Sequence, residues 1–175
     1  MGVEIERRFL VDKMPEINVE EIKNIIQYYL PMQEWLAVWP GDYNEIQSLL
    51  IESTTTFRLR SIDNLAYATI KGRSDGATRL EFEMEIEHNE LELIVKNMNY
   101  PYVKKQRMVF PVKDGLFWEI DDFRGDNLGL IIAEIEIPSE NYPIELPNWL
   151  GEEITGEDGE WSNHALAINP LKNRT

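Results

Sequence analysis

The chain has 175 residues, 43% of them hydrophobic and 28% charged, and its 17 basic and 32 acidic residues give a formal net charge of −15. These values predict one globular domain with a substantial core, exclude a disordered chain, and argue against a duplex nucleic acid as partner. The sequence has no cysteine, no apolar run long enough to span a membrane and no apolar stretch after its charged start, so we expect a cytoplasmic protein without disulfides, thiolate metal sites or a membrane partner.

Eight segments alternate in polarity, or are rich in β-branched and aromatic residues, as strands are. In chain order they are 3–11, 25–31, 56–62, 65–72, 79–87, 101–111, 116–123 and 130–138. Tight turns such as Asp63-Asn64 join most neighbours, which predicts a mainly antiparallel sheet. Because eight strands close readily into a barrel, the predicted fold is α+β but mainly β, an eight-stranded antiparallel closed barrel with a few helices packed outside.

Three helices are predicted, at residues 18–24 with Asn18 as N-cap, at 89–98 and at 162–168. Residues 31–55 are interpreted as an insertion in a single domain of residues 1–175. It holds Trp35, Trp39 and Tyr43, and packing on the outside of the barrel is favoured over a role as a lid or partner surface near a tunnel mouth. Residues 139–161 are rich in Pro, Gly and Glu, and we expect them to cover one end of the barrel.

Charged residues recur at alternate positions in strand after strand. Side chains at i and i+2 of a strand face the same way, so each of these strands has a charged face and an apolar face. For one strand alone, a charged face in water is the commoner arrangement. Here, however, whole strands are purely acidic, as at Glu81 and Glu83, or purely basic, as at Arg58 and Arg60. Because like charges on adjacent strands repel, this segregation favours an interior with an acidic wall and a basic wall.

An interior of this kind suits a polyphosphate with a bound metal. Carboxylate oxygens are ligands for hard divalent cations such as Mg²⁺ and Mn²⁺, and Arg and Lys bind phosphate oxygens. Buried charges are costly unless each is paired or bound, so without a ligand the channel must contain water.

Motifs in a fixed order cover nearly the whole chain. They include Glu4-Ile5-Glu6-Arg7-Arg8, Thr56-Phe57-Arg58-Leu59-Arg60, Thr69-Ile70-Lys71-Gly72, Lys105-Gln106-Arg107, Trp118-Glu119-Ile120-Asp121 and Glu134-Ile135-Glu136. This series resembles the CYTH superfamily, also called triphosphate tunnel metalloenzymes, although that family has a lysine where this chain has Arg8. The resemblance implies an antiparallel eight-stranded tunnel, a bound triphosphate, and Mg²⁺ or Mn²⁺ as cofactor.

The resemblance also implies roles for the charged positions. The expected catalytic residues are Glu4, Glu6, Arg8 and Lys71. The expected phosphate-binding residues are Arg8, Arg58, Arg60, Lys71 and Arg107, with Arg79 and Lys105 as weaker candidates. The expected metal ligands are Glu4, Glu6, Glu81, Glu83, Glu134 and Glu136. We interpret Glu85, Glu119 and Asp121 as partners of the basic wall, and His88 and His164 as caps or surface residues.

The expected function is divalent-metal-dependent hydrolysis of a small triphosphate or polyphosphate. Inorganic tripolyphosphate, nucleoside triphosphates and thiamine triphosphate share the part that these residues would bind, so all three stay open. One alternative is a class IV adenylate cyclase-like lyase acting on ATP. Another is a module that binds triphosphate without turnover, which Arg8 in place of lysine keeps open. A structural barrel with a wet interior is the least favoured interpretation, and a homodimer is left open.

Overall fold

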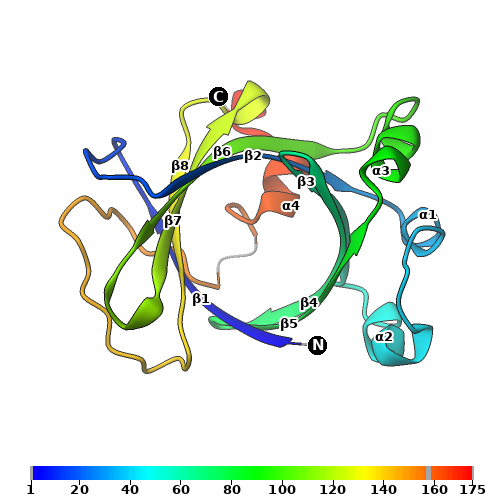
Figure 1. The fold of residues 1–175 in the computed structure, drawn as a ribbon, viewed down its shortest axis with the longest axis horizontal. Helices are drawn as coiled ribbons and strands as arrows, with labels where there is room; N and C mark the ends of the chain where they lie inside the picture. The colour runs from blue at the N-terminus through cyan, green and yellow to red at the C-terminus, as the bar shows by residue number, and fades with distance from the viewer. Residues whose placement is uncertain (1, 157–158, 175) are drawn as a thin grey trace.

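The computed structural model describes residues 2–156 and 159–174, and its strands form a closed antiparallel barrel in the order β1-β5-β4-β3-β2-β6-β7-β8 (Figure 1). The strands are β1 Gly2–Leu10, β2 Glu21–Tyr29, β3 Thr56–Ile62, β4 Leu65–Asp75, β5 Thr78–Ile86, β6 Tyr102–Pro111, β7 Phe117–Arg124 and β8 Ile131–Glu136. The eight predicted strands and the closed antiparallel barrel are therefore confirmed.

The predicted helix at residues 18–24 is wrong. Strand β2 begins at Glu21, and residues 21–24 pair with residues 106–109 of β6. The burial of Ile25, Gln27 and Tyr29 at alternate positions continues this strand to its end. The backbone hydrogen bonds that β6 offers outweigh the weak local preference for a helix, as tertiary pairing often does.

The described residues form four α-helices, α1 Met32–Leu36, α2 Tyr43–Leu50, α3 His88–Val95 and α4 Asn163–Ile168. Short 3₁₀ turns lie at Lys113–Gly115, Gly125–Asn127 and Leu171–Asn173. Helices α3 and α4 match predicted ones, and Ser162 caps α4 by accepting a hydrogen bond from the Ala165 N–H. Helices α1 and α2 lie in the insertion, where no helix was predicted.

Helices α1, α2 and α3 lie outside the barrel and cover β3, β4 and β5 (Figure 1). Their apolar side chains meet the outward faces of those strands, with Trp35, Ile46 and Leu49 packed near Leu59 and Ile70. The insertion thus packs on the outside of the barrel, which is the interpretation favoured from the sequence. Its last residues, 53–55, nevertheless reach the interior cavity.

Residues 139–161 divide into two parts, so the expectation that they cover one end is only half right. Tyr142, Ile144 and Trp149 pack on the outward faces of β7 and β8 beside Trp118. Further along, the Ile154 N–H donates to the Arg8 carbonyl, so this part extends the barrel wall next to β1. Gly156 and Gly159 line the interior cavity, and α4, which contacts β2 and β6, follows them there, with Leu166 packed on Val103, Phe123 and Ile132 (Figure 1).

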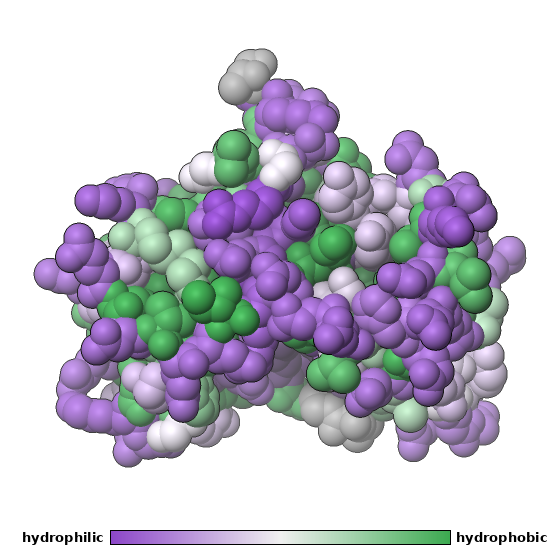
Figure 2. Space-filling view, turned by 45° about the horizontal axis from the view of Figure 1, so that its top comes forward, coloured by the Kyte–Doolittle hydropathy of each residue, from purple (hydrophilic) through white to green (hydrophobic). Residues whose placement is uncertain are grey.

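The outer surface is largely polar. Hydrophilic residues cover most of the face in Figure 2, and hydrophobic side chains gather there only in smaller groups. Among the described residues, no helix is both long and apolar enough to cross a membrane. This polar exterior is separate from the charged faces of the strands, which lie inside the barrel.

Candidate active site

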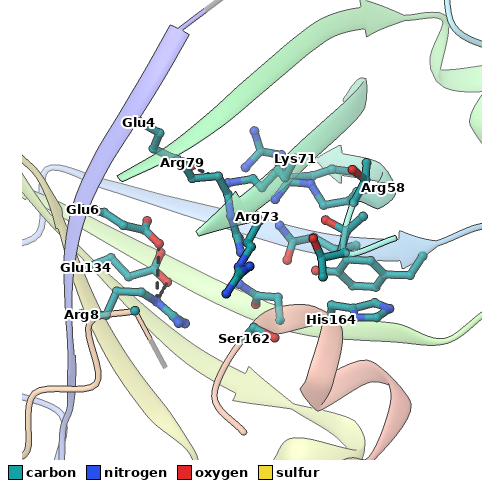
Figure 3. A pocket seen from close by; sticks show the side chains of 18 of the residues that line it. Glu4, Glu6, Arg8, Arg58, Lys71, Arg73, Arg79, Glu134, Ser162 and His164 are labelled. Carbon is teal, nitrogen blue, oxygen red and sulfur yellow. Dashed lines mark hydrogen bonds and ion pairs between the residues drawn. The ribbon is translucent and has the colours of Figure 1, made fainter. Parts of the chain in front are cut away.

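The inward faces of the strands enclose a polar cavity of about 610 Å³ (Figure 3). Because side chains alternate along each strand, the same alternation that buries Leu59 and Ile70 outside the barrel directs Arg58 and Lys71 inward. The charged residues that line the cavity are Glu4, Glu6, Arg8, Arg58, Arg60, Lys71, Arg73, Arg79, Lys105, Arg107, Glu119, Glu134 and Glu136. The predicted charged interior of the barrel is therefore confirmed.

The strand order groups the charges by sign. Strands β7, β8, β1 and β5 are consecutive around the barrel and carry the carboxylates that line the cavity or pair with its cations, although β1 also carries Arg8 and β5 also carries Arg79. Strands β4, β3, β2 and β6 complete the circle with the inward Lys71, Arg58 and Arg107, and β2 contributes the neutral Gln27 between two basic strands. The predicted acidic and basic walls are therefore opposite arcs of the barrel.

One group of ion pairs joins β1, β3, β4 and β5, and we call it the open network. The Lys71 ammonium lies 2.7 Å from Glu4 and 2.6 Å from Glu81. Arg58 lies 3.2 Å from Glu83 and 3.5 Å from Glu81, and Arg60 lies 2.7 Å from Glu83. Its members are Glu4, Arg58, Arg60, Lys71, Glu81 and Glu83. Each cation is thus held by at least one carboxylate of the acidic arc.

A second group of ion pairs centres on Asp121, and we call it the buried network. The two oxygens of Asp121 accept hydrogen bonds from Arg107, each at 2.7 Å, and one of them also accepts from Lys105. Arg107 reaches Glu134 at 2.6 Å and also pairs with Glu119. Its members are Arg8, Lys105, Arg107, Glu119, Asp121 and Glu134. Asp121 and Glu119 therefore pair with the basic wall, as interpreted from the sequence.

Arg8, which replaces the lysine of the first motif, is fixed by several partners. Its guanidinium donates to Glu134 at 3.0 Å and to the Trp161 carbonyl at 3.0 Å, and lies 3.7 Å from Glu6. Burial opposes its charge, but Glu134 and Glu6 raise the pKa of Arg8 above its ordinary value. Arg8 therefore supplies a permanent positive charge rather than a transferable proton.

The carboxylates differ in the charge that surrounds them. Burial alone would raise the pKa of Glu4, but Lys71 and Arg58 outweigh it and lower the pKa to about 2. Burial also opposes ionisation of Glu134, yet Arg8, Lys105 and Arg107 hold its pKa below the usual range. In contrast, burial and the neighbouring Glu134 raise the pKa of Glu6 to about 7. Negative charge at Glu6 is therefore incompletely compensated by the protein.

Several donors and acceptors in the described residues have no hydrogen-bond partner although they are buried at the cavity. They include Nε of Arg58, Nε of Arg60 and Oε1 of Gln27. Buried polar groups are normally satisfied, so these atoms indicate room for a polar ligand. Donors on arginines suit phosphate oxygens, so the basic arc fits an anionic phosphate chain.

The acidic arc fits a divalent cation by its chemistry. Glu4, Glu6, Glu134 and Glu136 are hard oxygen donors on the same cavity. Burial and the carboxylates of Glu4 and Glu119 raise the pKa of Glu136, as crowding raises that of Glu6, and a cation would relieve this repulsion. The described residues hold no preformed cluster of three or more ligands, so metal binding requires some movement of these side chains.

The structure brings most of the predicted site residues to the cavity wall. Glu81 and Glu83 are the exceptions, since they lie behind Arg58 and Lys71 as their ion-pair partners and do not line the cavity. His88 begins α3 outside the barrel, 3.8 Å from Glu92. His164 is exposed, as interpreted, and α4 also places it on the cavity, with its ring 5.0 Å from that of Tyr29.

Sequence reasoning missed other residues that line the cavity. They are Gln27, Tyr29, Ser53, Thr54, Thr55, Thr56, Arg73, Ser162 and Asn163. Extending the alternation from Lys71 by one step would have found Arg73, and the period of β2 would have found Gln27 and Tyr29. Nothing in the local sequence signals that residues 53–55 or the start of α4 reach the same space.

Comparison with known proteins gives near full-length relatives. The chain is 34% identical over 174 residues to the inorganic triphosphatase of Acetivibrio thermocellus, covering 99% of this chain and 98% of that protein. It is 29% identical over 168 residues to the inorganic triphosphatase of Nitrosomonas europaea, covering 95% of this chain and 97% of that protein. No family profile matches the chain.

Solved structures share the same architecture. The crystal structure of an inorganic triphosphatase superimposes with a TM-score of 0.62 at 29% sequence identity, covering 96% of each chain. A putative adenylate cyclase from Bacillus halodurans superimposes with a TM-score of 0.54 at 15% identity, covering 80% of this chain and 84% of that chain, a likeness of fold alone.

Proposed function

The chain belongs to the CYTH superfamily of triphosphate tunnel metalloenzymes, and we propose that inorganic tripolyphosphate is the triphosphate that it hydrolyses. The observation that carries this proposal is the near full-length similarity to two inorganic triphosphatases. The cavity supports it, because its lining is charged or hydroxyl-bearing and the only rings on it are those of Tyr29 and His164, among the described residues. These two rings contact each other, which leaves no evident platform for a nucleoside base.

In this proposal the phosphate chain binds to the basic arc. Arg58, Arg60 and Lys71 would hold phosphate oxygens from one side, and Arg107 and Arg8 from the other. Arg79 and Lys105 also line the cavity, although Lys105 is almost completely buried. Each phosphate oxygen would take over part of the role that a carboxylate plays in the ion pairs. This exchange keeps the buried cations compensated, so binding avoids the cost of isolated charge.

A divalent cation, Mg²⁺ or Mn²⁺, would be held by carboxylates of the acidic arc. Glu4, Glu6, Glu134 and Glu136 line the cavity and are the proposed ligands, while Glu81 and Glu83 would act through Lys71 and the two arginines. When bound, such an ion neutralises phosphate charge and orients the attacking water. The protein's own cations stabilise the charge that develops on the leaving diphosphate, and Arg8 contributes this charge without exchanging a proton.

The test is a phosphate-release assay with tripolyphosphate, ATP and thiamine triphosphate, each with Mg²⁺ and with Mn²⁺. We expect the highest kcat/KM with tripolyphosphate, and no release when the metal is chelated. Glu6→Gln removes a negative charge from the acidic arc, and it should lower the rate by about 100-fold or more while the fold is kept. Lys96→Gln changes an exposed residue at the end of α3 and serves as the control.

Three results would contradict the proposal in different ways. Faster turnover of an organic triphosphate would show that this compound, and not inorganic tripolyphosphate, is the substrate. Formation of cyclic AMP from ATP would support the lyase alternative. Tight binding of tripolyphosphate without phosphate release under either metal would support the module that binds without turnover.

A further inference from the structure

A β-bulge in β4 lies beside the open end of the cavity. The register between β4 and β5 passes from Lys71–Glu81 to Ser74–Arg79, so three steps on β4 match two on β5. Such a bulge adds one residue and redirects a side chain. Gly72, within the bulge, is buried against α2, where an added Cβ would lie 2.9 Å from Leu49 Cδ2. Helix α2 therefore fixes the bulge from outside, and Arg73 faces the cavity (Figure 3).

Arg73 differs from the other cations of the cavity. Arg8, Arg58, Arg60, Lys71, Lys105 and Arg107 all form ion pairs with carboxylates. Among the described residues, Arg73 forms no hydrogen bond or ion pair, and it is exposed. An anion can therefore bind Arg73 without first displacing a carboxylate.

Hydroxyl-bearing residues line the same cavity as this arginine. The consecutive residues Ser53, Thr54, Thr55 and Thr56 line the same cavity, just before β3. The Thr55 hydroxyl donates to the Leu49 carbonyl at 2.7 Å, which ties the segment to α2. Ser53, Thr54 and Arg73 also line a second surface hollow of about 670 Å³, so they stand where the cavity meets the outer surface. This hollow contains Glu52 and Asp75 as well, so Arg73 is a local positive charge in acidic surroundings.

We propose that Arg73 and the segment 53–56, together called the rim site, are where the phosphate chain first binds and where its outer phosphate stays bound. This proposal rests on the proposed function. The formal net charge of −15 repels a polyanion at long range, so capture depends on the positive charge at the rim. From the rim site the phosphate chain can pass to Lys71 and Arg58, where its oxygens must displace the carboxylates that pair with these two cations.

The experiment compares Arg73→Gln with Lys96→Gln, since both remove one exposed positive charge but Lys96 lies outside the cavity. With tripolyphosphate at low ionic strength, we expect Arg73→Gln to lower kcat/KM about 10-fold, with kcat changed less than about twofold. The difference between the two variants should shrink at high salt, because screening weakens attraction at an exposed site. Thr54→Val should also lower kcat/KM, but by a smaller factor than Arg73→Gln does.

Calorimetry separates this proposal from the proposed function. Tripolyphosphate is titrated into metal-free protein, which needs no turnover, and Arg73→Gln should raise Kd while Lys96→Gln leaves it unchanged. If the wild type bound tripolyphosphate through Arg73 but released no phosphate, the proposed function would fail and the rim site would stand. Equal Kd and kcat/KM for the two variants would overturn the rim site. A loss in kcat alone would also overturn it, because Arg73 would then act on the reacting groups instead.

Discussion

The two ion-pair networks inside the barrel come from the same alternating pattern but differ in their access to solvent. In the buried network, the side chains of Lys105 and Asp121 are 1% and 0% exposed. In the open network, those of Lys71 and Glu4 are 14% and 27% exposed. A pair removed from water must remain intact, because an isolated buried charge is very costly. A pair that water can reach can exchange its partner, which is what phosphate binding requires. The comparison therefore predicts that the Lys105–Asp121 pair chiefly stabilises the fold and that the Lys71–Glu4 pair chiefly serves ligand binding.

The largest expected effect is on stability in the buried network. Asp121→Asn leaves Lys105 and Arg107 without their shared carboxylate, and we expect it to lower the free energy of unfolding by about 3 to 5 kcal/mol. The matched change in the open network, Glu83→Gln, should cost about 1 kcal/mol, because the Glu83 side chain is 27% exposed whereas that of Asp121 is 0% exposed. Denaturant unfolding of the metal-free proteins measures both values. Equal losses would show that exposure does not separate the networks.

The next largest effect is on activity in the open network. Arg60→Ala removes a cation that we propose binds phosphate, and we expect kcat/KM for tripolyphosphate to fall about 100-fold. Because the Arg60 side chain is partly exposed, the thermal midpoint should change little. Arg124→Ala, which removes a cation from the outer face of β7, is the control and should keep full activity. An Arg60 variant that unfolds as readily as Asp121→Asn would place this residue with the structural pairs.

A smaller effect concerns pH and Glu6, which stands between the two networks. The pKa of Glu6 is raised from 4.5 to about 7 by burial and by Glu134. Below pH 4.5 Glu6 is protonated in both the folded and the unfolded chain, so its titration costs no stability. As the pH rises toward the higher value, the unfolded chain ionises first, so folding loses stability. Glu6→Gln cannot ionise and should avoid this loss.

Thermal unfolding in the presence of a chelator tests this pH dependence. The midpoint of Glu6→Gln relative to that of the wild type should increase between pH 4.5 and about pH 7 and level off above that range. Added Mg²⁺ should stabilise the wild type more than the variant at the higher pH. A constant difference between the two proteins across this range would mean that Glu6 has an ordinary pKa in the folded chain.

The smallest effect concerns Arg8, which joins the buried network to the cavity. Arg8→Lys keeps the charge but loses the forked contacts to Glu134 and the Trp161 carbonyl, so it should cost about 1 kcal/mol of stability. We expect kcat to stay within about fivefold of the wild type, because Arg8 acts through its charge. A large gain in kcat would instead show that this position uses an exchangeable proton.

The strands and the charged interior could be predicted because both follow from one strong local signal. Alternation along Glu4, Glu6 and Arg8, or along Arg58 and Arg60, fixes which side chains share a face, and segregation of sign indicates where that face lies. The sequence motifs then supplied the family. These features need no knowledge of distant contacts.

The remaining features depend on contacts between distant segments. The pairing of residues 21–24 with β6 determines that they are strand, and the placement of α4 determines that His164 faces the cavity. The split of the ionic residues into two networks depends on register, which joins Arg107 to Asp121. The path of residues 53–55 depends on α2 packing outside β4. None of these contacts leaves a periodic pattern in the sequence.

The pairing of β1 has a consequence for protein synthesis. Strand β1 is made early, yet it pairs with β8, and Arg8 meets Glu134 across 126 positions of sequence. Until the ribosome has delivered β8, the nascent chain carries Arg8 without Glu134 and β1 with an unpaired edge. Closure of the barrel is therefore a late event with high contact order, and slow elongation near residue 130 would prolong an aggregation-prone intermediate.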